Sequence, residues 1–177
     1  MKTGLRIALA LLALLVLSTA AVLVWSWAPD LPTTELEQRW AQPPSTFIEV
    51  QGLRVHLRDE GPRDDPTPLV LVHGTSASLH TWDGWTEELR TTRRVIRFDL
   101  PGFGLTGPNA ADDYSMAVYV RLVLALLDQL GVQRFAIGGN SLGGEVAWAT
   151  AHAAPQRVEK LILVDAAGYA FEPESMP

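Results

Sequence analysis

The longest hydrophobic stretch of this chain lies near its N-terminus. Residues 7–27 contain no charged side chain. As a helix that rises 1.5 Å per residue they would extend about 31 Å, which matches a bilayer core of about 30 Å. The pattern therefore predicts one membrane-spanning helix.

Beyond residue 46 the apolar residues recur in short segments that predict strands. In residues 53–58 apolar and polar positions alternate, as in a strand with one solvated face, and residues 47–50 would form its hairpin partner. Residues 69–72 are apolar without interruption, as expected for a strand covered on both faces. Three more buried strands are expected, at residues 94–99, 135–138 and 161–165.

Apolar residues at helical spacing lie between these strands. One predicted helix follows the strand at 69–72 and presents a single apolar face, formed by Trp82, Trp85 and Leu89. A longer helix would begin after Ser115 and stop at Gly131. Its expected apolar face consists of Met116, Val120, Val123, Leu124 and Leu127. The alternation of strands and helices predicts an α/β domain, with a mainly parallel sheet and helices on both faces.

Charged residues flank the hydrophobic N-terminal stretch asymmetrically. Lys2 and Arg6 precede it, and acidic residues follow it. Because basic flanks stay on the cytoplasmic side, we expect a cytoplasmic N-terminus and a domain on the outer, periplasmic or extracellular, side. The competing interpretation is a secreted protein with a cleavable signal, for which residues 18–20 or 26–28 offer weak cleavage sites.

Composition divides the chain into three parts and excludes several function classes. Residues 1–28 would form the anchor, the proline-containing residues 29–46 an extended tether, and residues 47–177 the folded domain. The chain has 14 Lys and Arg against 20 Asp and Glu, without a basic run, which excludes a nucleic-acid partner. It has no cysteine, so a disulfide framework, a thiolate zinc site and a cysteine nucleophile are excluded.

The segment with the clearest chemical meaning follows the predicted strand at 135–138. It reads Gly139-Asn140-Ser141-Leu142-Gly143, and an alanine-rich helical stretch comes directly after it. A G-x-S-x-G sequence is informative only in this strand-turn-helix context, where the serine adopts a positive φ and its neighbours must be small. The amino end of the following helix points at the hydroxyl, so the Leu142 amide can stabilise an oxyanion.

A second oxyanion donor is expected from the loop that follows the strand at 69–72. This loop reads His73-Gly74-Thr75-Ser76-Ala77-Ser78. Its small residues would allow the Thr75 amide to approach Ser141, with His73 shaping the turn and Gly74 avoiding a side-chain clash. Two loops at strand ends are thus expected to converge on one hydroxyl.

These motifs resemble the α/β-hydrolase fold superfamily. The segments HGTSAS, DLPGFGLT at residues 99–106, and GNSLGG stand in that family's order, and the resemblance covers residues 47–177. The GNSLGG segment is similar to that of the esterases and carbon-carbon bond hydrolases in this superfamily. It does not resemble the haloalkane dehalogenases or epoxide hydrolases, which need a carboxylate at the position of Ser141. The resemblance implies a serine nucleophile, an ester-like or other carbonyl substrate, and no cofactor or metal.

The resemblance also implies a histidine and an acid after Ser141. His152 would lie roughly 16 Å away along the same helix, too far for a general base. His56 is expected on the solvated face of its strand, and His80 near the pocket rim. The family's cap and last strands have no counterpart in this chain, so we expect the catalytic histidine outside it, in a longer protein.

Four other polar residues near these motifs have two interpretations each. Asp165, at the end of the strand at 161–165, is either the triad acid or a strand-end residue that binds local backbone. Asp99 is expected to form a turn. Asn140 would order the sharp turn at residues 139–143, called the elbow below, and Glu145 the helix that follows it, or each would contact the substrate.

The sequence thus predicts a membrane-anchored serine hydrolase that acts through an acyl-enzyme. The alternatives are a binding module that retains the elbow only for folding, and an acyltransferase that uses the same serine. The substrate and the oligomeric state stay open at this stage.

Overall fold

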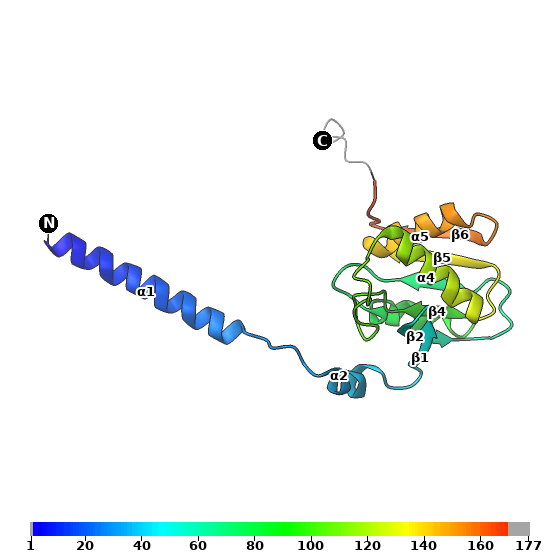
Figure 1. The fold of residues 1–177 in the computed structure, drawn as a ribbon, viewed down its shortest axis with the longest axis horizontal. Helices are drawn as coiled ribbons and strands as arrows, with labels where there is room; N and C mark the ends of the chain where they lie inside the picture. Colours follow the sequence, from blue (N-terminus) through cyan, green and yellow to red (C-terminus); the bar gives the residue numbers. More distant parts are fainter. Residues whose placement is uncertain (1, 170–177) are drawn as a thin grey trace. The chain divides into compact units, whose positions relative to one another are not determined.

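The computed structural model describes residues 2–169 and divides the chain into two units, Met1–Pro32 and Thr33–Pro177. The first unit contains one helix, α1, over Lys2–Ser26 (Figure 1). Its residues Thr3–Ser26 have a mean hydropathy of 2.8 and are long and apolar enough to cross a membrane. The helix predicted within residues 7–27 is therefore confirmed up to Ser26.

The second unit begins with a short helix, α2, over Thr33–Trp40. The expectation of an extended tether through residues 29–46 is wrong for these residues. The sequence does contain a sign of this helix. Glu35 stands in its first turn and Arg39 in its last, where each charge interacts favourably with the helix dipole. The nearby prolines obscured it.

The sheet has six strands in the order β1-β2-β4-β3-β5-β6. The strands are β1 (Thr46–Val50), β2 (Leu53–Glu60), β3 (Leu69–Val72), β4 (Val95–Phe98), β5 (Phe135–Asn140) and β6 (Val158–Val164). Strand β2 is antiparallel to β1 and to β4, whereas β4, β3, β5 and β6 are parallel to one another.

The mainly parallel sheet and the hairpin predicted from the sequence are confirmed, and β3, β4 and β5 are buried as predicted. The strand expected at residues 161–165 forms as β6, but the expectation that it is buried is wrong. It lies at the edge of the described sheet, and Leu161 and Leu163 are 40% and 39% exposed.

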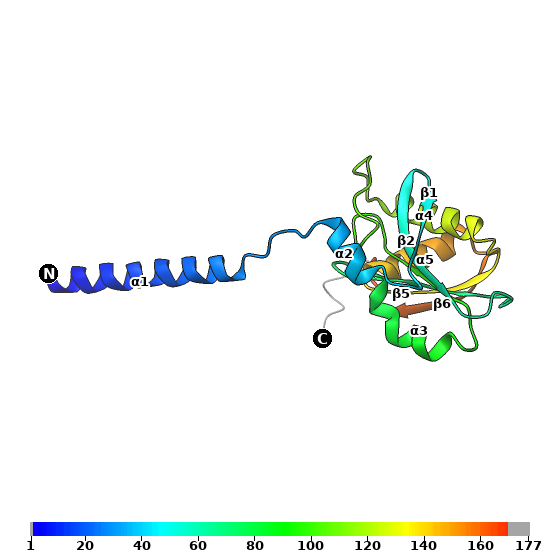
Figure 2. The same cartoon turned by 90° about the horizontal axis from the view of Figure 1, so that it is seen from below.

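Helices cover both faces of the sheet, as predicted (Figure 2). One face is covered by α4 (Met116–Gln129) and α5 (Leu142–Ala153). The other is covered by the short helix η1 (Leu79–Trp82) and by α3 (Asp83–Leu89). In the parallel strands alternate residues face opposite layers, so Val70 packs in the cluster that contains α4, and Leu71 packs in the cluster that contains Trp82.

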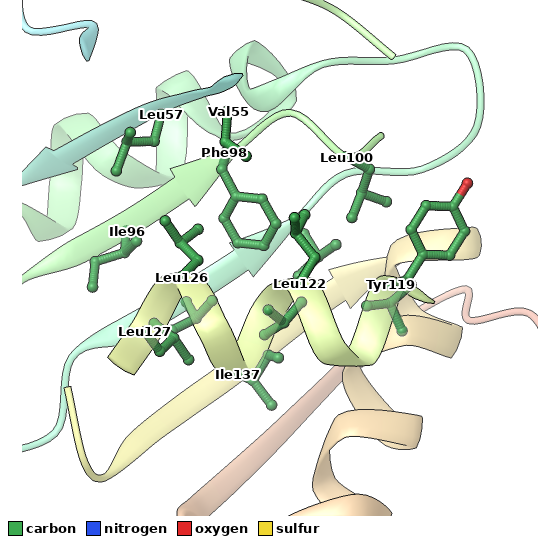
Figure 3. Packing of buried hydrophobic residues seen from close by; sticks show 14 of the residues in the cluster. Val55, Leu57, Ile96, Phe98, Leu100, Tyr119, Leu122, Leu126, Leu127 and Ile137 are labelled. Atoms are coloured by element: carbon green, nitrogen blue, oxygen red, sulfur yellow. The ribbon is translucent and has the colours of Figure 1, made fainter. Parts of the chain in front are cut away.

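The larger core cluster lies between the sheet and α4. Figure 3 shows Phe98 and Ile96 of β4 directed toward Leu122 and Leu126 of α4. The predicted face of α4 was correct at Val123 and Leu127, which are buried.

Three other residues on that predicted face, Met116, Val120 and Leu124, are only half-buried. Tyr119, Leu122 and Leu126 complete the buried face instead. The helix is apolar over much more than one face, so its periodicity did not fix its rotation.

The other layer also differs from its predicted pattern. Trp82 is buried and Leu89 half-buried, but Trp85 is 42% exposed, and Thr86 occupies the buried position. The physical reason is that Trp82 belongs to η1, a 3-10 helix, whereas Trp85 belongs to α3. The change of helical geometry at Asp83 shifts the buried face by one residue.

Candidate active site

Ser141 stands at the junction between β5 and α5. Its φ is 52° and its ψ is −120°, a conformation that costs a non-glycine residue about 1–3 kcal/mol. Its side chain is half-buried, and the first residue of α5 is Leu142. The strained backbone therefore presents the Ser141 hydroxyl at the carboxyl edge of the sheet, directly before a helix N-terminus.

Close backbone packing explains the glycines around Ser141. A Cβ on Gly139 would overlap the carbonyl group of Gly143, and a Cβ on Gly143 would overlap the carbonyl oxygens of Val72 and His73. Both overlaps involve backbone atoms, which cannot rotate away. Strand β5, helix α5 and the end of β3 approach this closely only because these positions have no side chain.

The loop after β3 lies directly against Ser141. A Cβ on Gly74 would lie 2.6 Å from Oδ1 of Asn140 and 3.2 Å from Cβ of Ser141. The amide that follows, that of Thr75, belongs to the same short loop. The structure thus brings together the two loops that the sequence predicted would converge.

His73 is fully buried and holds this loop through both ring nitrogens. Nδ1 donates to the carbonyl oxygen of Gly74 (2.8 Å), and Nε2 accepts from the amide of Leu100 (3.0 Å). Burial lowers the pKa of His73, and this outweighs the Gly74 hydrogen bond and the charge of Asp99, which raise it. A neutral His73 therefore connects the loop after β3 to the loop after β4.

Asp99 is the central acceptor of the loop after β4. Its carboxylate accepts from the amides of Leu79 (2.7 Å) and Leu105 (2.8 Å) and from Nδ1 of His56 (2.8 Å). Burial alone would raise the pKa of Asp99, but these hydrogen bonds hold the pKa below its ordinary value. Asp99 thus ties η1 and the residue 99–106 loop to β2.

The expectation of a solvated His56 is wrong. The side chain is 1% exposed, and its Nε2 lies 2.9 Å from Oγ of Ser45. The face of β2 that the alternation marked as polar is covered by Ser45, directly before β1, and by Phe47 of β1, which both contact the ring. The alternation within β2 does not reveal this cover, and an extended tether over residues 29–46 predicts none from Ser45.

None of the four histidines in residues 2–169 hydrogen-bonds to the Ser141 hydroxyl. His56 and His73 have both ring nitrogens bound elsewhere, and His152 lies on the exposed surface of α5. His80 binds the Asp83 carboxylate through Nδ1 (3.0 Å) and the Trp40 carbonyl through Nε2 (3.1 Å). In the described part of the chain, the buried pair of His56 and Asp99 contacts the hydroxyl of Ser45 and not that of Ser141.

Asp165 flanks the elbow from the end of β6. The Ser141 amide donates to the Val164 carbonyl (3.1 Å), and the Ala167 amide donates to the Ser141 carbonyl (3.0 Å). In the sequence, Asp165 lies between Val164 and Ala167, which make these two contacts. It is exposed and has a φ of 45°. In residues 2–169 its carboxylate has no hydrogen bond to a histidine, and no cluster of three metal-ligating side chains is present in that range.

The buried neutral His73 predicts a pH-dependent stability. Its pKa in the folded protein lies below 6.5, so the unfolded chain binds the proton first as pH falls, and the free energy of unfolding decreases below about pH 6.5. His73→Gln should therefore flatten the decrease between about pH 7 and about pH 5, measured by urea unfolding of the detergent-solubilised protein. His152→Gln, at an exposed position, is the control and should retain the wild-type slope. An unchanged slope in His73→Gln would contradict the assignment.

Comparison with known proteins agrees with this architecture. The sequence profile of the alpha/beta hydrolase fold family matches residues 67–177. The chain is 36% identical over 127 residues to a 2-hydroxymuconate semialdehyde hydrolase of Pseudomonas sp. (strain CF600), covering 70% of this chain and 44% of that protein. It is 31% identical over 119 residues to human epoxide hydrolase 4, covering 67% of this chain and 33% of that protein.

A solved structure is similar over nearly the whole chain. The crystal structure of a membrane phospholipase A, a bacterial virulence factor, has a TM-score of 0.69 and 30% identity, and the match covers 96% of this chain and 54% of that one. The matches thus span between about a third and about half of the length of these three proteins. The profile match over residues 67–177 shows that the chain belongs to the α/β-hydrolase fold family.

Proposed function

We propose that this chain provides the nucleophile and oxyanion hole of a serine hydrolase, with Ser141 as nucleophile. The observation that supports this most strongly is the positive φ of Ser141 at a junction between strand and helix. Strained residues are concentrated at active sites and ligand-binding sites. The hydrolases among the relatives support the reaction class.

The proposed oxyanion hole consists of the amides of Leu142 and Thr75. Leu142 is the first residue of α5, where the amide is free and the helix dipole is positive. Thr75 follows Gly74, which contacts the elbow. Two fixed amides are worth several kcal/mol to an acyl-transfer transition state, because removing one donor from such a site costs about 10²–10³ in rate.

In the proposed reaction, Oγ of Ser141 attacks the substrate carbonyl carbon and its proton passes to a histidine outside this chain. The tetrahedral intermediate collapses when the bond to the leaving group breaks, and the leaving group takes up that proton. Water then hydrolyses the acyl-enzyme by the same sequence of steps. We propose an ester-like or other carbonyl compound as substrate, rather than an epoxide, because a serine and not a carboxylate stands at the elbow.

We propose Asp165 as the acid of the triad. It ends the strand after the nucleophile helix, and its neighbours Val164 and Ala167 hydrogen-bond to the backbone of Ser141. Its exposed carboxylate has no competing partner in residues 2–169. In the proposed triad, a histidine lies between the Asp165 carboxylate and the Ser141 hydroxyl.

We propose that α1 anchors the protein in a membrane as a single span, with a cytoplasmic N-terminus and the hydrolase domain on the outer side. The length and hydropathy of Thr3–Ser26 support the span, and Lys2 and Arg6 support the orientation. A signal sequence has the same properties, so secretion after cleavage is the alternative.

An activated Ser141 should react with a fluorophosphonate probe. Oγ forms a bond to phosphorus, fluoride leaves with the electron pair of the P–F bond, and the hydroxyl proton passes to the base. Peptide mass spectrometry of the labelled full-length protein should place the adduct on Ser141, and Ser141→Ala should abolish it. Ser115→Ala, at an exposed serine without a side-chain capping bond, should label normally. An unlabelled wild type would indicate the non-catalytic binding module instead.

Asp165→Asn should slow this labelling, because a triad acid orients the histidine and stabilises its protonated form. The expected loss is at least about a hundredfold, measured as the second-order rate constant of labelling. Asp112→Asn is the matched control, since Asp112 is also exposed and has a φ of 51°. Equal rates in the two variants would exclude Asp165 as the acid.

A further inference from the structure

A cavity lies on the side of the loops after β3 and β4 that faces α2. It has a volume of about 290 Å³. Eight residues line it, namely Leu36, Trp40, His56, Ser78, His80, Asp99, Gly104 and Leu105. Two of these residues come from α2, and the reaction proposed above makes no use of this cavity.

The polar side chains that line the cavity have little hydrogen-bonding capacity left for a ligand. Both ring nitrogens of His56 and of His80 are bound to protein groups. The Asp99 carboxylate already accepts three hydrogen bonds. Oγ of Ser78 accepts from the His80 amide (3.3 Å), which leaves its hydroxyl proton free. A polar ligand would lose its hydration without compensation here, whereas an apolar group would not.

Helix α2 is held in place as a wall of this cavity. The Trp40 carbonyl accepts from Nε2 of His80, and the rings of Trp40 and His80 lie 5.5 Å apart. A second contact holds the same helix, because Oε1 of Glu37 accepts from Arg54 of β2 (2.6 Å). The apolar side chains of Leu36 and Trp40 therefore stay directed at the cavity.

The cavity and Ser141 lie at the same edge of the sheet. Asp99 follows β4 and Ser141 follows β5, and β3 pairs with both of these parallel strands. Two strand spacings of about 4.8 Å put the ends of β4 and β5 about 10 Å apart. The residue 73–78 loop connects them, because Gly74 contacts Ser141 and Ser78 lines the cavity.

We propose that this cavity binds a medium-length alkyl group of the substrate whose carbonyl Ser141 attacks, and that α2 sets the preferred chain length. The proposal rests on the proposed function. Helix α2, which precedes the sheet, would then take part in substrate selection, with Leu36 as a specificity-determining residue. The preferred substrates would be esters whose alkyl chain reaches from Ser141 to α2.

The test compares two fluorophosphonates that differ only in their alkyl chain, ethyl against octyl. Leu36→Trp fills the cavity, so the ratio of the octyl to the ethyl labelling rate at Ser141 should fall at least about tenfold from its wild-type value. Gln38→Trp, on the exposed side of the same helix, is the matched control and should leave both rates unchanged. An equal octyl-to-ethyl ratio in wild type and Leu36→Trp would overturn the proposal.

A binding measurement separates this proposal from the proposed function. Ser141→Ala is mixed with octyl acetate or ethyl acetate, and saturation transfer from the protein is measured by NMR. With Ser141→Ala, saturation should be transferred to the methylene groups of octyl acetate. With the double variant Ser141→Ala/Leu36→Trp, this transfer should be lost. If neither probe labels wild type while this transfer occurs, the nucleophile assignment fails and the cavity stands. If labelling occurs without this transfer, the cavity assignment fails.

Discussion

The site depends on one constraint, the approach of three backbone segments around Ser141. Gly139 and Gly143 remove the side chains that would separate β5, α5 and the end of β3. Only with that approach can the chain turn from strand into helix within one residue. The strain of about 1–3 kcal/mol at Ser141 is then maintained by the packing of a sheet and a helix on either side of it.

A second layer of buried polar groups fixes the loops around this bend. His73 connects the loop after β3 to Leu100, and Asp99 connects the loop after β4 to η1 and β2. Each of these groups is buried with its hydrogen bonds satisfied, which makes such networks rigid. A loop held in this way can keep an amide aimed at a hydroxyl without reorganisation during a reaction.

The sequence was sufficient for the elements whose pattern is local. The sheet was predicted from the continuous apolar run at 69–72 and from the alternation of strands and helices. The elbow was predicted from the glycines around Ser141. His56 and Trp85 were misplaced because their burial depends on distant or irregular segments: Ser45 and Phe47 cover His56, and the change from η1 to α3 turns Trp85 outward. Helix α2 is too short, at 8 residues, for periodicity to reveal it.

The most direct test of the central claim is a crystal structure of the full-length protein after reaction with a fluorophosphonate. The account predicts phosphorus bonded to Oγ of Ser141, a positive φ retained at that residue, and the phosphoryl oxygen within hydrogen-bonding distance of the Leu142 and Thr75 amides. A phosphoryl oxygen directed to solvent, with both amides bound to other groups, would contradict it.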